Sequence, residues 1–187
     1  MPGRLSNKVL ATIALLAATL AAGCAVGNLH GYHDVVVPLS HSGTGTIAVA
    51  TYDQRSYVRS GEKGADFVGV QRAGFGNPFD VRTESGHDLA YDVTLSTCRS
   101  LEKRGYRPVP VALEPTDSPE AVLQKVGAAR GDRAILVAIQ EWRSDTYNRT
   151  GLDYRLTLKV LDPRFAVLGE ARLDGRDVLG GSMWNPP

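Results

Sequence analysis

The pattern of the last third of the chain most constrains its fold. Residues 133–139 are almost entirely apolar, and their length fits a strand buried on both faces. Residues 152–160 then alternate apolar and polar side chains, as in a strand with one solvated face. Asp162 and Pro163 predict a turn, after which residues 165–177 run back as an antiparallel strand. The C-terminal third is therefore expected to be three consecutive strands.

The middle of the chain mixes strands with helices. The expected strands are 46–52, a hairpin of 67–72 with 79–83, and an edge strand at 106–111, where two prolines remove ladder donors. One helix is expected to begin at Ser85 as N-cap and end before Gly105; another begins at Ser118. This order, a strand, a hairpin, a helix, a strand, a helix and three strands, predicts an α+β fold. We expect a single mixed sheet with two helices on one face.

Composition excludes several classes of protein. The chain has 187 residues, 43% hydrophobic and 22% charged, which are values of a globular protein and not of a disordered chain or coiled coil. The formal net charge of +1 gives no electrostatic footprint for nucleic acid. Two cysteines cannot form a disulfide framework or a cysteine-based zinc site.

The N-terminus has the pattern of a secretory signal peptide. Arg4 and Lys8 precede an uncharged run at 9–22, which is too short for the roughly 20 residues that span a bilayer as a helix. Residues 20–24, Leu-Ala-Ala-Gly-Cys, resemble the lipobox of bacterial lipoproteins, although Ala21 stands where leucine is commoner. The resemblance implies cleavage before Cys24 and acylation of its thiol, which would hold the protein on membrane lipid. Plain secretion, with Cys24 incidental, is the alternative.

These features divide the chain into four parts. Residues 1–23 are expected to be a lipoprotein signal peptide, 24–45 a flexible tether, 46–179 a periplasmic α+β domain and 180–187 an irregular tail. Ala25 follows the cysteine where aspartate would favour inner-membrane retention, so the resemblance implies the periplasmic face of the outer membrane.

Short motifs in the domain resemble those of a family of uncharacterised bacterial lipoproteins. They are residues 53–55, 67–69, 74–79 and 83–86. The expected architecture is similar to that of YajG-type lipoproteins and, more distantly, to the N-terminal domain of TolB. The likeness covers most of residues 46–177, and it implies no chemistry, because the family has no established activity.

The glycine-rich segment 74–79, Gly-Phe-Gly-Asn-Pro-Phe, is the most distinctive of these motifs. A phosphate-binding loop would need a helix after it, whereas a strand follows here. We therefore favour a tight turn with both aromatic side chains packed on the sheet. The alternative is a recognition loop that exposes Phe75, with Asn77 beside it, to a partner.

Asp53 and Arg55 follow the first buried strand, where a ligand-binding pair would lie. We favour instead an ion pair that closes the sheet edge and fixes the next loop, with Asp53 accepting N–H groups from the glycine turn.

No catalytic or metal site is evident. His87 lies near Ser85 and Asp88 in sequence, but no Gly-x-Ser-x-Gly motif occurs, so we expect His87 to be a surface residue. His30 and His33 lie in the expected tether, where nothing fixes the geometry that zinc requires. We expect no cofactor, no metal and no nucleic acid.

Three functions follow. The first is a membrane-anchored lipoprotein whose periplasmic domain binds or scaffolds an envelope protein partner, without catalytic activity. The second is an accessory subunit of an envelope transport or secretion assembly, which would use an edge strand to pair with a neighbour. The third is an envelope hydrolase that uses His87 or Asp53.

Overall fold

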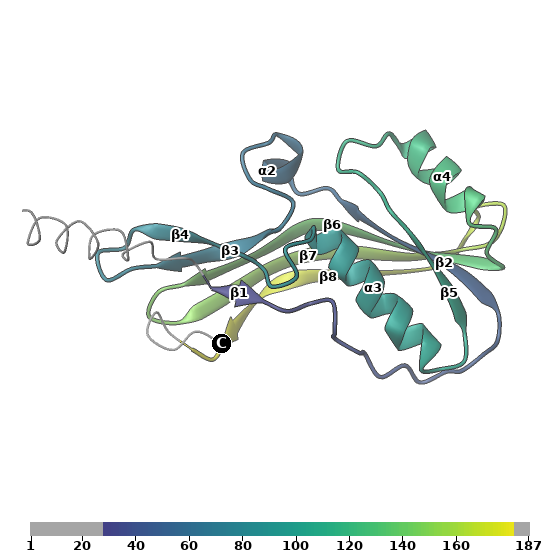
Figure 1. Ribbon diagram of the computed structural model, residues 1–187, viewed down its shortest axis with the longest axis horizontal. Helices are drawn as coiled ribbons and strands as arrows, with labels where there is room; N and C mark the ends of the chain where they lie inside the picture. The colour runs from purple at the N-terminus through teal and green to yellow at the C-terminus, as the bar shows by residue number, and fades with distance from the viewer. Residues whose placement is uncertain (1–27, 182–187) are drawn as a thin grey trace, which may run out of the picture.

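A computed structural model describes residues 28–181 and has one mixed sheet of eight strands (Figure 1). The strands are β1 Leu29–His30, β2 Thr46–Asp53, β3 Phe67–Arg72, β4 Pro78–Thr83, β5 Arg107–Val111, β6 Arg133–Thr146, β7 Thr150–Leu161 and β8 Val167–Leu179. The helices within these residues are α2 Ser56–Arg59, α3 Leu89–Glu102 and α4 Pro119–Ala128. The predicted α+β class and the single mixed sheet are confirmed. No helix in the described range is long and apolar enough to cross a membrane.

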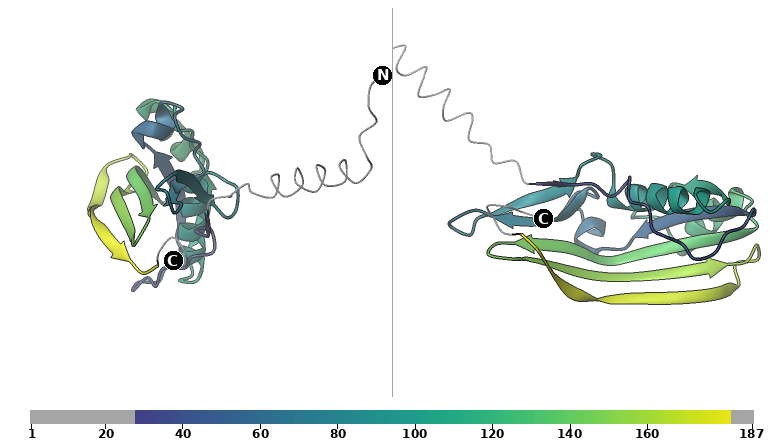
Figure 2. Two further views of the ribbon diagram at one scale, coloured as in Figure 1. Left: turned by 90° about the vertical axis from the view of Figure 1, so that its left-hand side faces the viewer. Right: turned by 90° about the horizontal axis from the view of Figure 1, so that it is seen from below.

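Strand β6 is the axis of the sheet. Its first half pairs in parallel with β2, with Ile47 opposite Arg133, and its last residues pair in parallel with β3, with Gly69 opposite Ser144. Its other edge pairs with β7 along almost its whole length. Because two strands share one edge of β6, the sheet forks, and β6, β7 and β8 run side by side along the molecule (Figure 2).

The two long helices lie on opposite faces of β2, which corrects the expectation of one face. Successive side chains of a strand point to opposite faces. Ile47 and Val49 pack with Cys98 and Leu101 of α3. Their neighbours Ala48 and Ala50 pack with α4, whose buried residues are Val122 and Val126. β2 is apolar almost throughout because both of its faces are covered.

The start of α3 also differs from the prediction. The helix begins at Leu89, with Asp88 at the N-cap position and no side-chain cap. The Ser85 hydroxyl instead donates to the Asp92 carboxylate at 2.7 Å and accepts from the backbone N–H of His87 at 3.1 Å. Ser85 therefore orders the turn before the helix. The predicted start of the second helix is confirmed, since the Ser118 hydroxyl accepts from the N–H of Ala121 at 3.2 Å.

Residues 28–45 pack on the domain, which corrects the expected boundary of the tether. β1 pairs in parallel with β4. Further on, the Val35 carbonyl accepts from Ser96 Oγ at 2.7 Å, and the Val37 N–H donates to Ser100 Oγ at 2.9 Å. The two serines lie one turn apart on α3, so this segment runs along the helix. We call residues 28–45 the strap. Composition does not reveal its packing, because the bonds join the backbone of the strap to small polar side chains far away in the sequence. The expected signal peptide, Cys24 and most of the tail lie outside the described residues.

Candidate functional site

The β3–β4 hairpin projects from one end of the sheet and carries the most exposed aromatic side chain in the described chain (Figure 1). Its turn is closed by two backbone bonds, from Ala73 N–H to the Asn77 carbonyl at 2.9 Å and from Gly76 N–H to the Ala73 carbonyl at 2.7 Å. Gly76 has φ of 82°, which favours glycine at this position. Phe75 is 99% exposed and Asn77 is exposed beside it. The prediction that both aromatics pack on the sheet is therefore wrong for Phe75.

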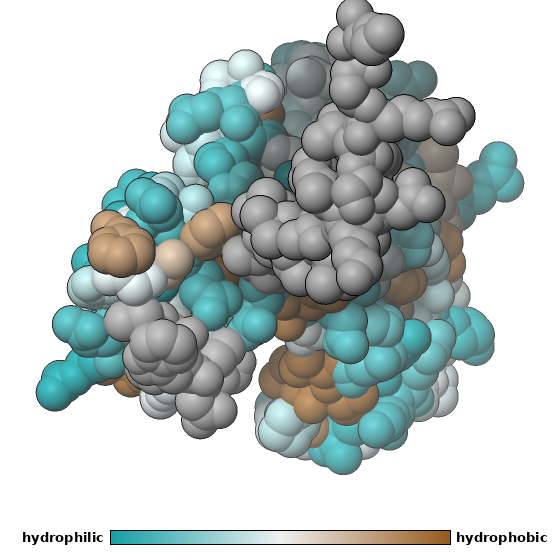
Figure 3. Space-filling view, turned by 60° about the vertical axis from the view of Figure 1, so that its left-hand side comes forward, coloured by the Kyte–Doolittle hydropathy of each residue, from teal (hydrophilic) through white to brown (hydrophobic). Residues whose placement is uncertain are grey.

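The surface around this end is mainly hydrophilic, with apolar side chains in small separate groups (Figure 3). A fully exposed phenyl ring on a polar surface gains nothing for folding, because it is as hydrated in the folded protein as in the unfolded chain. Aromatic side chains of this kind are typical anchors of binding interfaces. The tip is therefore the best candidate for a contact with another molecule.

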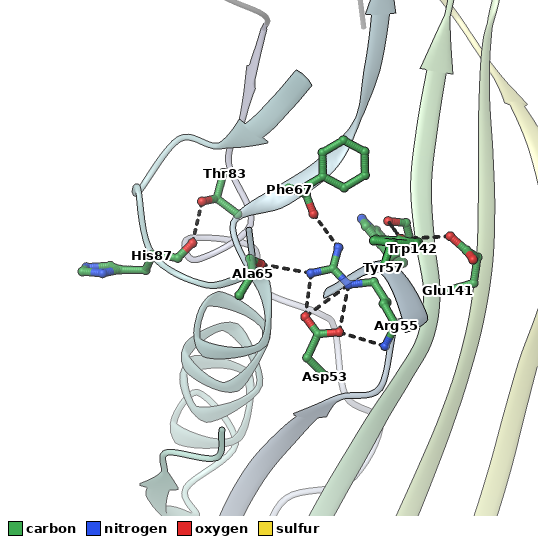
Figure 4. A network of polar contacts seen from close by, with 9 residues as sticks. All are labelled: Asp53, Arg55, Tyr57, Ala65, Phe67, Thr83, His87, Glu141 and Trp142. Atoms are coloured by element: carbon green, nitrogen blue, oxygen red, sulfur yellow. Dashed lines mark hydrogen bonds and ion pairs between the residues drawn. The ribbon is translucent and has the colours of Figure 1, made fainter. Parts of the chain in front are cut away.

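A buried ion pair positions the hairpin (Figure 4). Arg55 is 0% exposed and Asp53 2% exposed. The Arg55 side chain donates to Asp53 from Nε at 2.9 Å and from Nη2 at 2.6 Å. Nη2 also donates to the Ala65 carbonyl at 3.0 Å, and Nη1 donates to the Phe67 carbonyl. These bonds join the end of β2 to the first residue of β3.

The same geometry decides the role of Asp53 and Arg55. Every nitrogen of the guanidinium donates to a protein oxygen, and both side chains are buried, so neither can contact a ligand at the surface. The N–H that reaches Asp53 is that of Arg55 itself, at 3.1 Å, and not one from the glycine turn. Burial lowers the pKa of Arg55, but the hydrogen bonds and charge of Asp53 outweigh it and raise that pKa. The pair is a structural ion pair that fixes the following loop.

Tyr57 extends this network toward β6. Its hydroxyl donates to Glu141 Oε1 at 2.9 Å, and its ring lies 5.5 Å from the Arg55 guanidinium carbon. The pKa of Tyr57 is raised overall, mainly by burial and further by the charge of Glu141. The positive charge of Arg55 offsets only part of this rise. The tyrosine is thus held as a neutral donor, and it fixes α2 against the sheet.

Two ion pairs that the sequence did not reveal hold the hairpin from its sides. Arg72 donates to both oxygens of Asp145 on β6, at 2.8 and 2.6 Å. Lys63 donates to Asp80 on β4 at 2.6 Å. The hydrogen bond from Arg72 lowers the pKa of Asp145. No signal in one sequence links residues 73 positions apart, so these pairs could be found only from the fold.

A polar groove of about 440 Å³ lies at the base of the hairpin. Lys63, Arg72 and Arg143 line it together with Glu62 and Asp80. Lys63 pairs with Asp80 inside the groove, and Arg72 pairs with Asp145 beside it, so the groove offers a mixed polar surface next to the exposed tip.

A second cleft of about 280 Å³ contains His87. Asp88, Tyr91, Thr94 and Glu114 share its lining. The His87 ring packs edge-to-face on Tyr91, with ring centres 5.2 Å apart. Burial raises the pKa of Asp88, and the nearby Glu114 charge adds to this effect. Among residues 28–181, no hydrogen bond joins the His87 ring to a hydroxyl, so the cleft lacks an assembled nucleophile and base.

The remaining candidate residues carry no assembled site. Cys98 is buried, and desolvation with the Glu102 charge raises its pKa to about 11, which keeps it a thiol. His33 lies 3.0 Å from Asp34, and burial lowers the pKa of His30. Within the described range, no group of three or more His, Cys, Asp or Glu side chains could hold a metal ion.

Comparison with known proteins gives the fold alone. No family model matches the chain, and neither does any curated protein. Among solved structures, the protein XCC0632 from Xanthomonas campestris, described under the family model DUF330, is 13% identical. The match covers 83% of this chain and 79% of that one, with a TM-score of 0.51.

Two further structures match less well. Lipoprotein GNA1162 from Neisseria meningitidis is 13% identical over 71% of this chain and 83% of that one, with a TM-score of 0.41. The C-terminal domain of LpoB from Salmonella enterica is 8% identical over 75% of this chain and 87% of that one, with a TM-score of 0.37. The resemblance to YajG-type lipoproteins and TolB stays a prediction, and what the comparisons establish is that this chain shares the fold of XCC0632.

Proposed function

We propose that this chain is a lipid-anchored lipoprotein of the bacterial outer membrane whose periplasmic domain binds or scaffolds another envelope protein. One observation supports the binding role best. The β3–β4 hairpin is held by three ion pairs, yet its tip presents a fully exposed Phe75. A rigid support lowers the entropy cost of binding, because the aromatic anchor is already in place.

The proposed anchor agrees with this arrangement. Cys24 lies four residues before Asn28, and Asn28 lies beside β4, where its carbonyl accepts from the Arg82 N–H at 3.3 Å. Four extended residues span at most about 14 Å. An acyl group on Cys24 would therefore hold the hairpin end of the domain close to the membrane surface, where envelope partners are concentrated.

The lipid anchor is tested by metabolic labelling. We expect radiolabelled palmitate to enter the full-length chain and not its Cys24→Ser variant, which lacks the acylated thiol. Equal labelling of both proteins, or of neither, contradicts the anchor and favours plain secretion.

The binding role is tested by crosslinking in living cells. A photoreactive amino acid at position 77, beside the phenyl ring, captures a neighbour in the otherwise unchanged protein. We expect Phe75→Ala to reduce the captured band at least about tenfold, as for an interface anchor. Tyr91→Ala is the matched control, because Tyr91 is an exposed aromatic residue on α3 and not part of the hairpin. Equal capture by both variants contradicts the role of Phe75.

An accessory role in an envelope transport or secretion assembly is a second candidate. It is favoured by the long edge strand β8, which no other described strand covers on its outer side. Capture of a transport subunit by the hairpin crosslinker would support this candidate over a general scaffold. The hydrolase alternative would rest on His87 alone, because the buried Asp53 carboxylate cannot reach a substrate.

A further inference from the structure

Strand β8 is an open edge of the sheet. Its residues, Val167–Leu179, pair with β7 on one side, and no other strand of the described chain pairs with them (Figure 2). Natural edge strands are blocked by short length, by proline, by bulges or by charged side chains. β8 is 13 residues long, contains no proline, and keeps a regular register from Gly169 to Leu179, but it carries charged side chains. It can therefore accept another strand along most of its length only where the charges of the two strands match.

The charges of β8 have opposite signs at equal distances on the two sides of Leu173. Glu170 and Arg172 precede it, and Asp174 and Arg176 follow it. All four side chains point to one face, since they alternate along the strand. Arg172 pairs with Glu170 of the same strand at 2.6 Å, and the other three contact β7. Asp174 lies 3.1 Å from Arg155, Glu170 lies 3.8 Å from Lys159, and Arg176 lies 3.6 Å from Asp153.

We propose that β8 pairs antiparallel with β8 of a second copy of this chain, about a two-fold axis at Leu173. This pairing places Arg172 opposite the second copy's Asp174, and Glu170 opposite the second copy's Arg176. Each contact occurs twice because of the symmetry. On the other face Leu173, which is 55% exposed, meets its own counterpart. Opposite charges and apolar pairs directly across an antiparallel ladder are stabilising.

The charges also select this register over its neighbours. A two-fold axis at Arg172 would place that arginine against its own copy and Glu170 against Asp174. An axis at Asp174 would place that aspartate against its own copy and Arg172 against Arg176. Like charges directly opposite each other destabilise a ladder. An axis at Ala171 or Gly175 would create no like-charge pair, but it would pair only Glu170 with Arg172 or only Asp174 with Arg176. Only the axis at Leu173 gives opposite charges at all four positions.

The charge pattern continues into the flanking strands. In one row of side chains across the joined sheet, Asp153 and Arg176 of one copy would lie next to Glu170 and Lys159 of the second copy. Negative and positive charges would alternate along this row. The next row would begin with Arg155, Asp174 and the second copy's Arg172. A long exposed strand needs charged side chains for solubility. Solubility alone does not require charges of opposite sign at equal distances on the two sides of Leu173.

The pairing does not depend on the proposed lipid anchor. The pairing is nevertheless compatible with the lipid anchor. A two-fold axis perpendicular to the sheet places Asn28 of both copies at the same height along the axis. A membrane perpendicular to that axis is then equally distant from both anchors.

The first test is a disulfide at the axis in the full-length chain, in detergent micelles with a mild oxidant. Paired Cα atoms in an antiparallel ladder lie about 4.5–5.5 Å apart, within the range that a disulfide bridges. We expect Leu173→Cys to give a crosslinked dimer. Gly169→Cys is the matched control, since a Cβ there meets no atom within 4 Å, yet its two copies would lie roughly 27 Å apart. Absence of the dimer, or equal crosslinking at both positions, overturns the proposal.

The second test uses the wild-type chain and two charge variants, and it does not require a cysteine. Sedimentation in detergent should give a concentration-dependent dimer, and a protein that stays monomeric overturns the proposal. Arg172→Asp and Asp174→Arg should each weaken the dimer about tenfold, because each places two like-charge pairs across the ladder. Mixing the two variants restores opposite charges at both contacts, so we expect the mixture to dimerise again. If it stays monomeric, the register is wrong.

Discussion

Two regions of this protein use ion pairs in opposite ways. At the base of the β3–β4 hairpin, the Asp53–Arg55 pair is buried, and the backbone of Ala65 and Phe67 satisfies its remaining donors. On β7 and β8, pairs such as Arg155 with Asp174 are more than 60% exposed on both sides. A buried pair costs desolvation and fixes one conformation, whereas an exposed pair contributes little stability and stays available for other contacts. The difference separates a rigid support from an adaptable edge.

The largest effect on the free energy of unfolding is expected when one partner of the buried ion pair is removed. Arg55→Met leaves the Asp53 carboxylate buried without its counterion and frees two backbone carbonyls. We expect the free energy of unfolding to fall by about 3–5 kcal/mol. Arg155→Met, the exposed counterpart, should change it by less than about 1 kcal/mol. Denaturant unfolding of both variants measures the difference, and equal losses would show that burial does not distinguish the two pairs.

A smaller effect is expected where β3 of the hairpin pairs with β6. A Cβ on Gly69 would lie 2.5 Å from the Ser144 carbonyl oxygen, so β3 approaches β6 closely only because this residue is glycine. We expect Gly69→Ala to lower the free energy of unfolding by about 1–3 kcal/mol, as for overpacking. Gly74→Ala is the matched control, since a Cβ there meets nothing within 4 Å. Thermal unfolding that is unchanged in Gly69→Ala would mean that the two strands can separate at no cost.

The sequence predicted the elements better than their arrangement. Periodicity identified the strands around 133–139 and 152–160, because burial on one or two faces leaves a local pattern. Periodicity could not assign α3 and α4 to opposite faces of β2, since an apolar strand has the same sequence pattern whichever helix covers each face. The sequence predicts a tether over 24–45 because the backbone makes the bonds of Val35 and Val37 to Ser96 and Ser100, and such bonds need no particular side chain in the segment.

The candidate site was predicted in part. Phe75 and the Asp53–Arg55 pair could be selected from their motifs, but whether each is exposed or buried depends on the surrounding chain. Arg72 and Asp145 were missed, since only the parallel pairing of β3 with β6 brings them together. Interactions between distant residues leave no trace in the order of one sequence.

The Arg72 and Asp145 side chains are 35% and 27% exposed, so this pair lies between the two extremes. Its hydrogen bonds lower the pKa of Asp145 in the folded state. A carboxylate with a lowered pKa adds stability above its unfolded-state pKa, and that stability is lost as the pH falls through the folded-state value. We expect Asp145→Asn to be less stable than the wild type at pH 7, by less than Gly69→Ala is. The gap should close below about pH 4, as followed by unfolding at several pH values; a gap that widens in acid would contradict the assigned pair.

The smallest effect on folding is expected at the hairpin tip, and its smallness is the informative result. Phe75 is 99% exposed, so Phe75→Ala removes no buried surface, and the free energy of unfolding should change by less than about 0.5 kcal/mol. Val68→Ala, on the buried part of the same hairpin, should cost several times more, because Val68 is 0% exposed. Denaturant unfolding of the two variants separates a side chain that holds the fold from one that does not. If Phe75→Ala were as destabilising as Val68→Ala, the ring would be part of the core in solution, and the tip could not serve as a recognition anchor. A large residue that contributes nothing to the fold, placed on a hairpin that three ion pairs hold, is most simply explained by binding.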